Sequence, residues 1–121
     1  MSSTRVLVIE DNPDLRDYLR LALEPEGYVV LTARNGHDAL SYLNGHGVDV
    51  VLTDLFMPEM DGIEVISEVR KRSPQVRIIA MSGRPGVVDY LTVARELGVE
   101  RTLRKPFEID DLLAALRAGQ P

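Results

Sequence analysis

Four charged residues of this sequence lie where their side chains could do chemistry together. Glu10, Asp11, Asp54 and Lys105 each follow an apolar run directly or within two positions. Such runs are typical of buried strands, and open α/β sheets bind their ligands just outside the carboxyl ends of their strands. Carboxylates and an ammonium group at that edge indicate a site for a metal ion and a phosphoryl group.

The three acids need a partner of opposite charge if they converge. Adjacent carboxylates raise one another's pKa, and a hard cation such as Mg²⁺ removes that conflict by accepting carboxylate oxygens. Taken singly, Asp11 is better explained by a helix cap at Asn12-Pro13, and Asp54 by a turn. Taken together, their common position after strands favours a metal site, provided that the first and third strands are neighbours.

Two further residues at strand ends fit an anion site. Lys105 can place a point charge against a phosphoryl oxygen, although a lysine is more often a surface residue. Its bond to Pro106 can be cis or trans, and the sequence does not decide between them. Ser82 ends the fourth apolar run and precedes Gly83, so its hydroxyl could donate to an anion or simply belong to a turn.

The elements that must position these residues alternate regularly. Short, β-branched runs predict buried parallel strands, and stretches with helical periodicity predict a helix after each of them. This alternation predicts an α/β fold with helices on both faces of one parallel sheet, and the pattern alone leaves the strand order open. The strands are expected at residues 6–9, 28–31, 48–52, 76–81 and 102–103.

The helix boundaries follow from caps and breakers. The first helix should begin after Asn12 with Pro13 at its first position, and should end at Pro25 and Gly27. The others are expected from Asn35-Gly36 to Gly45, over residues 63–69, over 87–97 before Gly98, and over 109–116.

Composition narrows the class of protein. The chain has 121 residues, 45% of them hydrophobic, no cysteine and a formal charge of -5. Its length predicts a single domain, and its acidity argues against direct binding of nucleic acid. No apolar stretch approaches the roughly 20 residues that a membrane span needs, and no signal peptide is evident. We therefore expect a cytoplasmic protein without a membrane partner.

The motifs together resemble the receiver domain of two-component response regulators. The resemblance covers nearly the whole chain and is most specific over residues 54–62, which read Asp-Leu-Phe-Met-Pro-Glu-Met-Asp-Gly. The acidic pair after the first strand and Lys105-Pro106 near the end support it. The resemblance implies a flavodoxin-like (βα)5 doubly wound sheet with the strand order 2-1-3-4-5. A receiver domain is a standard example of this fold.

The resemblance also implies roles for single residues. Asp54 would accept a phosphoryl group from a sensor histidine kinase or a histidine phosphotransfer protein. Mg²⁺ would be held by Glu10, Asp11, Asp54 and the backbone carbonyl of Phe56. Lys105 would contact the phosphoryl oxygens. The hydroxyl of Ser82 would act as a switch that changes the face made by the fourth helix, last strand and last helix.

The chain departs from the family pattern at two places. Thr102 lies three residues before the lysine, where the family usually has Tyr or Phe, so we expect a muted or differently transmitted switch. Phe56 and Arg84 lie two residues beyond Asp54 and Ser82, at positions that tend to tune hydrolysis of the acyl phosphate. Bulky Phe56 could shield the phosphoryl group from water, which predicts a long-lived phosphorylated form.

The leading hypothesis is therefore a phosphorylation-dependent switch and not a turnover enzyme. A phosphate-independent interaction module with the same fold is the alternative, although such modules commonly lose one of the acids or the lysine. An aspartyl-phosphate hydrolase fits less well, since it needs a second Asp at the position of Phe56. We expect residues 1–121 to form one receiver domain with no output domain in this chain. Its output would pass to a downstream protein target or to a linked output domain.

Overall fold

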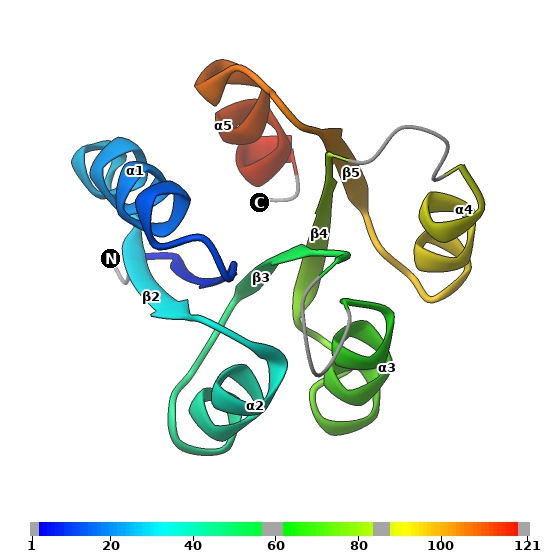
Figure 1. The fold of residues 1–121 in the computed structure, drawn as a ribbon. Helices are drawn as coiled ribbons and strands as arrows, with labels where there is room; N and C mark the ends of the chain where they lie inside the picture. Colours follow the sequence, from blue (N-terminus) through cyan, green and yellow to red (C-terminus); the bar gives the residue numbers. More distant parts are fainter. Residues whose placement is uncertain (1–2, 57–61, 84–87, 119–121) are drawn as a thin grey trace.

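A five-stranded parallel sheet forms the centre of the computed structural model, which describes residues 3–56, 62–83 and 88–118 (Figure 1). The order of its strands is β2-β1-β3-β4-β5, which confirms the expected flavodoxin-like topology. Ile9 lies opposite Thr53, so Glu10, which follows β1, and Asp54, the last residue of β3, lie at the same edge of the sheet. The strands are β1 Arg5–Ile9, β2 Val29–Ala33, β3 Val50–Asp54, β4 Arg77–Ser82 and β5 Arg101–Arg104.

Helices cover both faces of the sheet. Figure 1 shows α1 and α5 on one face and α2, α3 and α4 on the other. The helices are α1 Pro13–Leu23, α2 Gly36–Gly45, α3 Gly62–Arg72, α4 Val88–Glu96 and α5 Ile109–Ala118, and a 3-10 turn, Glu24–Glu26, follows α1.

The core has one apolar cluster on each face. Val8 and Leu52 pack toward Leu112 of α5, whereas Leu7 and Val51 belong to the cluster that includes α2 and α3. Because side chains alternate along a strand, a central strand covered on both faces must be buried throughout. All of β3 is buried, including its last, charged residue.

Side chains cap the first two helices as predicted. Oδ1 of Asn12 accepts hydrogen bonds from the backbone N–H groups of Asp14 at 2.9 Å and Leu15 at 3.2 Å. Oδ1 of Asn35 accepts one from the backbone of Asp38 at 2.8 Å. These caps satisfy N–H groups that have no partner inside the helix, and they fix where the chain turns after β1 and β2.

Some predicted boundaries were wrong by one or two residues. The third strand is Val50–Asp54 and not 48–52, because the ladder of hydrogen bonds extends past the apolar run to Asp54 itself. The second strand is likewise shifted, from 28–31 to Val29–Ala33. Pro25 does not end the first helix, since α1 ends at Leu23 and Pro25 lies inside the 3-10 turn. For the fourth helix, residue 87 lies outside the described residues.

Candidate functional site

Asp54 lies at the end of β3 with both carboxylate oxygens in hydrogen bonds. Oδ1 accepts a bond of 3.0 Å from the backbone N–H of Phe56, and Oδ2 accepts one of 2.9 Å from Nζ of Lys105. The residue is 7% exposed. The carboxylate is therefore held in one orientation at the edge of the sheet where ligands bind.

Glu10 and Asp11 bring two more carboxylates to the same place. Oε1 of Glu10 accepts a hydrogen bond of 2.5 Å from Lys105, and Oε2 accepts one of 3.1 Å from the backbone N–H of Asn12. Asp11 is exposed. One carboxylate oxygen each from Glu10, Asp11 and Asp54 lie within 4.8 Å of one another. The structure thus brings together the three predicted metal-binding acids.

Lys105 reaches this cluster across the end of β4. Its backbone N–H donates to the carbonyl of Ser82 at 2.8 Å, and its peptide bond to Pro106 is cis. Its stem runs close to Gly83, where an added Cβ would lie 3.2 Å from Cβ of the lysine. The lysine is thereby placed between Glu10 and Asp54 and is not a surface side chain.

The electrostatics of the pocket follow from burial and from this ion pair. Burial raises the pKa of Glu10 above 4.5, and it outweighs the opposing hydrogen bonds from Lys105 and from the backbone of Asn12. Burial would lower the pKa of Lys105, but its hydrogen bonds to Glu10 and Asp54 prevail and raise that pKa above 10.5. The lysine is consequently a permanent positive charge in the pocket.

Ser82 ends β4, next to the strand that carries Asp54. It is 2% exposed, and its Oγ has no hydrogen-bond partner among the described residues. A buried hydroxyl without a partner is costly. The hydroxyl is therefore available to a group that enters the pocket.

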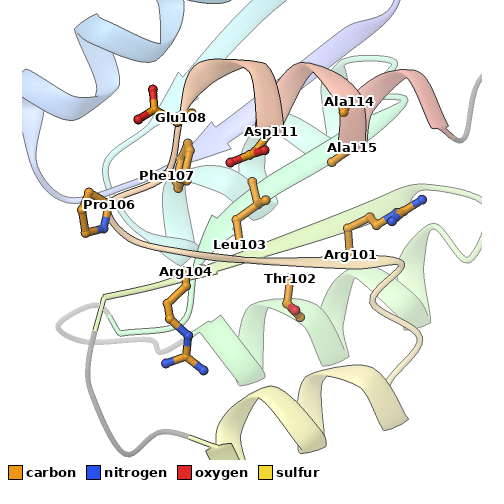
Figure 2. Close-up of a pocket in the computed structure, with 10 residues that line it drawn as sticks. All are labelled: Arg101, Thr102, Leu103, Arg104, Pro106, Phe107, Glu108, Asp111, Ala114 and Ala115. Atoms are coloured by element: carbon orange, nitrogen blue, oxygen red, sulfur yellow. The ribbon is translucent and has the colours of Figure 1, made fainter.

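Phe56 and Thr102, two of the residues that depart from the family pattern, lie in described parts of the structure. Phe56 is half-buried and packs against the cluster on the α2, α3 and α4 face. Thr102 lies on the open edge of the sheet, where Figure 2 shows its side chain and that of Leu103 on opposite sides of β5. Oγ1 of Thr102 accepts a long hydrogen bond of 3.5 Å from Arg95 of α4. Arg84 and the motif residues 57–61 lie outside the described residues.

Two arginines with several backbone partners had not been predicted, Arg16 beside the site and Arg70 at the opposite edge of the sheet, before β4 and β5. Arg16 donates hydrogen bonds to the backbone carbonyls of Glu10 and Asp11, and Arg70 binds the carbonyls of Val76, Leu97 and Gly98. An arginine on a helix usually belongs to the solvated face. Nothing in their spacing alone distinguishes these two from ordinary surface arginines.

The donor atoms of the acidic cluster fit a divalent cation. Mg²⁺ prefers oxygen ligands and usually takes one or two carboxylates together with waters and phosphate oxygens. Three carboxylates within 4.8 Å of one another supply that chemistry, and Asp11 leaves the cluster open to solvent.

In the described parts of the chain, no helix combines the length and the apolar character that crossing a membrane requires.

Curated relatives match nearly the whole chain. The transcriptional regulatory protein YkoG of Bacillus subtilis is 35% identical over 119 residues, which are 98% of this chain and 52% of that protein. The transcriptional regulatory protein TcrA of Mycobacterium tuberculosis is 34% identical over 118 residues, which are 98% of this chain and 46% of that protein. The chain thus spans about half the length of these relatives.

Solved structures share the fold. A CheY-like response regulator receiver domain protein from Methanospirillum hungatei superimposes with a TM-score of 0.92 and 25% identity, over 97% of this chain and 93% of that chain. The response regulator TrrA from Thermotoga maritima, in complex with Mg²⁺-BeF, gives 0.85 and 30% identity, over 95% and 97%. The family model for the response regulator receiver domain matches residues 6–117. The chain therefore belongs to the receiver domains of two-component response regulators.

Proposed function

We propose that Asp54 is the phosphoacceptor of this receiver domain. The observation that carries the proposal is the placement of its carboxylate. It is buried at the end of β3, hydrogen-bonded to Lys105 and to the backbone of Phe56, and accompanied by two acids within 4.8 Å. A nucleophile fixed in this way needs little reorganisation before it attacks.

The donor would be a phosphohistidine on a sensor histidine kinase or a histidine phosphotransfer protein. An oxygen of Asp54 attacks the phosphorus, and the bond from phosphorus to the imidazole nitrogen breaks. The nitrogen keeps the electron pair and takes up a proton, and the product is an aspartyl phosphate. The group transferred carries negative charge throughout, so catalysis depends mainly on positioning and on nearby positive charge.

Three groups of this chain would supply that environment. Glu10, Asp11 and Asp54, with the backbone carbonyl of Phe56, would hold Mg²⁺, which offsets the charge of the phosphoryl group. Lys105 already lies 2.9 Å from Asp54 and would contact the phosphoryl oxygens. The buried hydroxyl of Ser82, which has no hydrogen-bond partner in the described parts of the chain, would donate to the same group.

The signal would leave the site through Ser82 and the end of β4. Movement of that hydroxyl toward the phosphoryl group changes the face made by α4, β5 and α5. We propose that this face passes the signal to a downstream protein or to an output domain in the same protein. In this role residues 1–121 act as one receiver unit in the cytoplasm, and the domain modifies itself without turning over a separate substrate.

The test is phosphorylation by a small donor. The protein is incubated with acetyl phosphate and MgCl₂ and analysed by phosphate-affinity electrophoresis and intact mass. We expect one added phosphoryl group in the wild type, and none in Asp54→Ala or when EDTA removes the cation. Asp110→Ala is the matched control, because Asp110 is an exposed aspartate on α5.

The outcomes separate the candidate functions. A band shift that persists in Asp54→Ala would move the phosphoacceptor to another residue. No shift in the wild type with either acetyl phosphate or a phosphorylated histidine domain would favour the phosphate-independent interaction module. Phosphorylation without added or bound divalent cation would contradict the role given to Glu10 and Asp11.

A further inference from the structure

Arg16, the fourth residue of α1, contacts the backbone of Glu10 and Asp11, called here the acidic turn. Its Nη1 donates to the carbonyl of Glu10 at 2.7 Å and to the carbonyl of Asp11 at 3.2 Å. Within the described residues, no carboxylate lies within ion-pairing distance of Arg16, so its charge is directed to these carbonyls.

These two carbonyls belong to the peptide groups on either side of the Cα of Asp11. Holding both groups fixes the two backbone torsions of Asp11, and therefore the direction in which its side chain leaves the chain. The strand does not do this, because the last ladder bond nearby is the one from the backbone N–H of Glu10 to the carbonyl of Ala33 at 3.1 Å. Beyond that bond the chain leaves the sheet.

The other two acids of the cluster are held by their own side chains. Glu10 is bound by Lys105 and by the backbone of Asn12, and Asp54 is bound by Lys105 and by the backbone of Phe56. Asp11 is exposed and lacks the ammonium contact that its neighbours share. The direction of its carboxylate therefore depends on the backbone, where Arg16 acts.

We infer that Arg16 is a positioning residue for the cation site, which it serves by fixing the backbone that aims Asp11. The inference rests on the proposed Mg²⁺ site. Groups that hold a metal ligand in place commonly change metal affinity when they are removed. The charge of Arg16 acts in the opposite sense, since a positive charge near the turn repels a cation. Removing the side chain therefore distinguishes the two effects by the direction of the change.

The test measures Mg²⁺ binding by isothermal titration calorimetry, with no phosphoryl donor present. We expect Arg16→Met to weaken Mg²⁺ binding about tenfold. Arg16→Gln, whose shorter amide does not reach both carbonyls, should act in the same way and carries the test if the Met variant does not fold. Arg16→Lys keeps a donor of similar reach and should bind more tightly than either.

Arg20→Met is the matched control. Arg20 lies one turn later on α1 and donates to Thr32 of β2 at 3.1 Å, away from the acidic turn. The Arg20→Met substitution should leave the Mg²⁺ dissociation constant unchanged. Thermal unfolding without Mg²⁺ separates a loss of fold stability from a loss of affinity.

Each other outcome overturns the inference. Unchanged or tighter binding in Arg16→Met would mean that the side chain does not position the site. Equal weakening in Arg20→Met, or a Lys variant as weak as the Met variant, would point to a general effect on α1. If the wild type itself shows no Mg²⁺ binding, the proposed cation site fails, and this inference fails with it. Wild-type binding that Arg16 variants leave intact would overturn the inference alone.

Discussion

Lys105 lies between two buried carboxylates, and its charge balances much of theirs. Its side chain is 22% exposed, whereas those of Glu10 and Asp54 are 2% and 9% exposed. Removing one partner of a buried ion pair is destabilising because the other charge stays buried without compensation. The pocket thus depends on the lysine even before any phosphoryl group arrives.

We expect Lys105→Met to lower the free energy of unfolding by about 2 kcal/mol in metal-free buffer, less than for a fully buried pair. MgCl₂ should restore more stability to the variant than to the wild type, because the cation replaces the lost charge. Urea unfolding with and without MgCl₂ measures both effects. Lys71→Met is the control, since Lys71 is 74% exposed beside Glu68. Equal losses in the two variants would contradict the argument.

Glu10 gives the pocket a dependence on pH. Burial raises its pKa above 4.5, so the folded protein holds this proton more tightly than the unfolded chain does. Its contribution to stability is therefore full below pH 4.5 and is lost as the pH rises through the higher pKa of the folded state. Mg²⁺ needs the deprotonated carboxylate, so its affinity should rise over the same interval.

Calorimetric Mg²⁺ titrations and urea unfolding between about pH 5 and about pH 8 check both trends. Glu10→Gln cannot titrate at this position and should flatten the dependence of stability on pH. A dependence that survives unchanged in the variant would show that another group carries it.

We expect Phe56 to lengthen the lifetime of the phosphorylated form. Its ring is half-buried against the core cluster beside the site. We expect Phe56→Asn to speed loss of the phosphoryl group several-fold, because a smaller polar side chain admits water. Decay of the phosphorylated band after removal of the donor measures the rate. Phe56→Leu keeps apolar packing and should lie between the two, whereas equal rates in all three proteins would dismiss the shielding argument.

The junction of β3 and α3 depends on Gly62, the first residue of the helix. Its backbone N–H donates to the carbonyl of Leu55 at 3.1 Å, and an added Cβ would collide with the carbonyl oxygen of Asp54 and lie 2.6 Å from Cα of Leu55. The collision involves backbone, which cannot move aside without moving Asp54. The helix therefore starts close against the strand that carries the candidate phosphoacceptor.

Gly62→Ala should cost about 1–3 kcal/mol, as overpacking does in other cores, and should slow phosphorylation of Asp54. Gly45→Ala is a matched control, because Gly45 ends α2 and no atom of the described residues lies within 4 Å of an added Cβ. That change should be neutral or slightly stabilising. Thermal unfolding and acetyl phosphate labelling report on both variants. A Gly62 variant with wild-type labelling would mean that the junction does not position Asp54.

The order and type of the elements were predictable from sequence because caps and apolar runs are local signals. Asn12 and Asn35 marked the first two helices correctly. The ends of β2 and β3 were not predictable in the same way, since Ala33 and Asp54 join the ladder through pairing with neighbouring strands. Composition does not report pairing, so the apolar runs located the strands and left their last residues uncertain.

In the proposed function, the signal from Asp54 crosses the molecule to the face made by α4, β5 and α5. Thr102 takes the place of the usual aromatic residue and is linked to α4 by the long hydrogen bond from Arg95. We expect small changes at α4, β5 and α5 when Mg²⁺ and beryllofluoride are added, and larger ones in Thr102→Tyr. Backbone amide NMR shifts measure them.

Thr102→Val is the matched control for that experiment, since it keeps the shape and removes the hydroxyl. It should resemble the wild type. Large shifts over the whole face in the wild type, or a large inward rotation of Thr102, would contradict a muted switch.

The candidate site was predictable only in part, because its assembly depends on the whole fold. The acids and Lys105 were found from their positions after strands, but the contact between Lys105 and Glu10 was not. It requires the lysine to cross the end of β4, where Gly83 leaves room for its stem. Arg16 was missed because its partners are backbone carbonyls, which carry no signature in a sequence.

The contacts of Lys105 also bear on how the chain folds. The lysine follows Asp54 by 51 positions and Glu10 by 95. β1 and β3 can pair without β5, but that half-built sheet would enclose two carboxylates with no lysine between them. Burial of the acids is therefore unfavourable until the last strand joins the edge of the sheet. This lowers the stability of partly folded forms and makes folding more cooperative. Contacts between residues so distant in sequence form slowly. We therefore expect the pocket to be completed late in folding, when this ion pair forms.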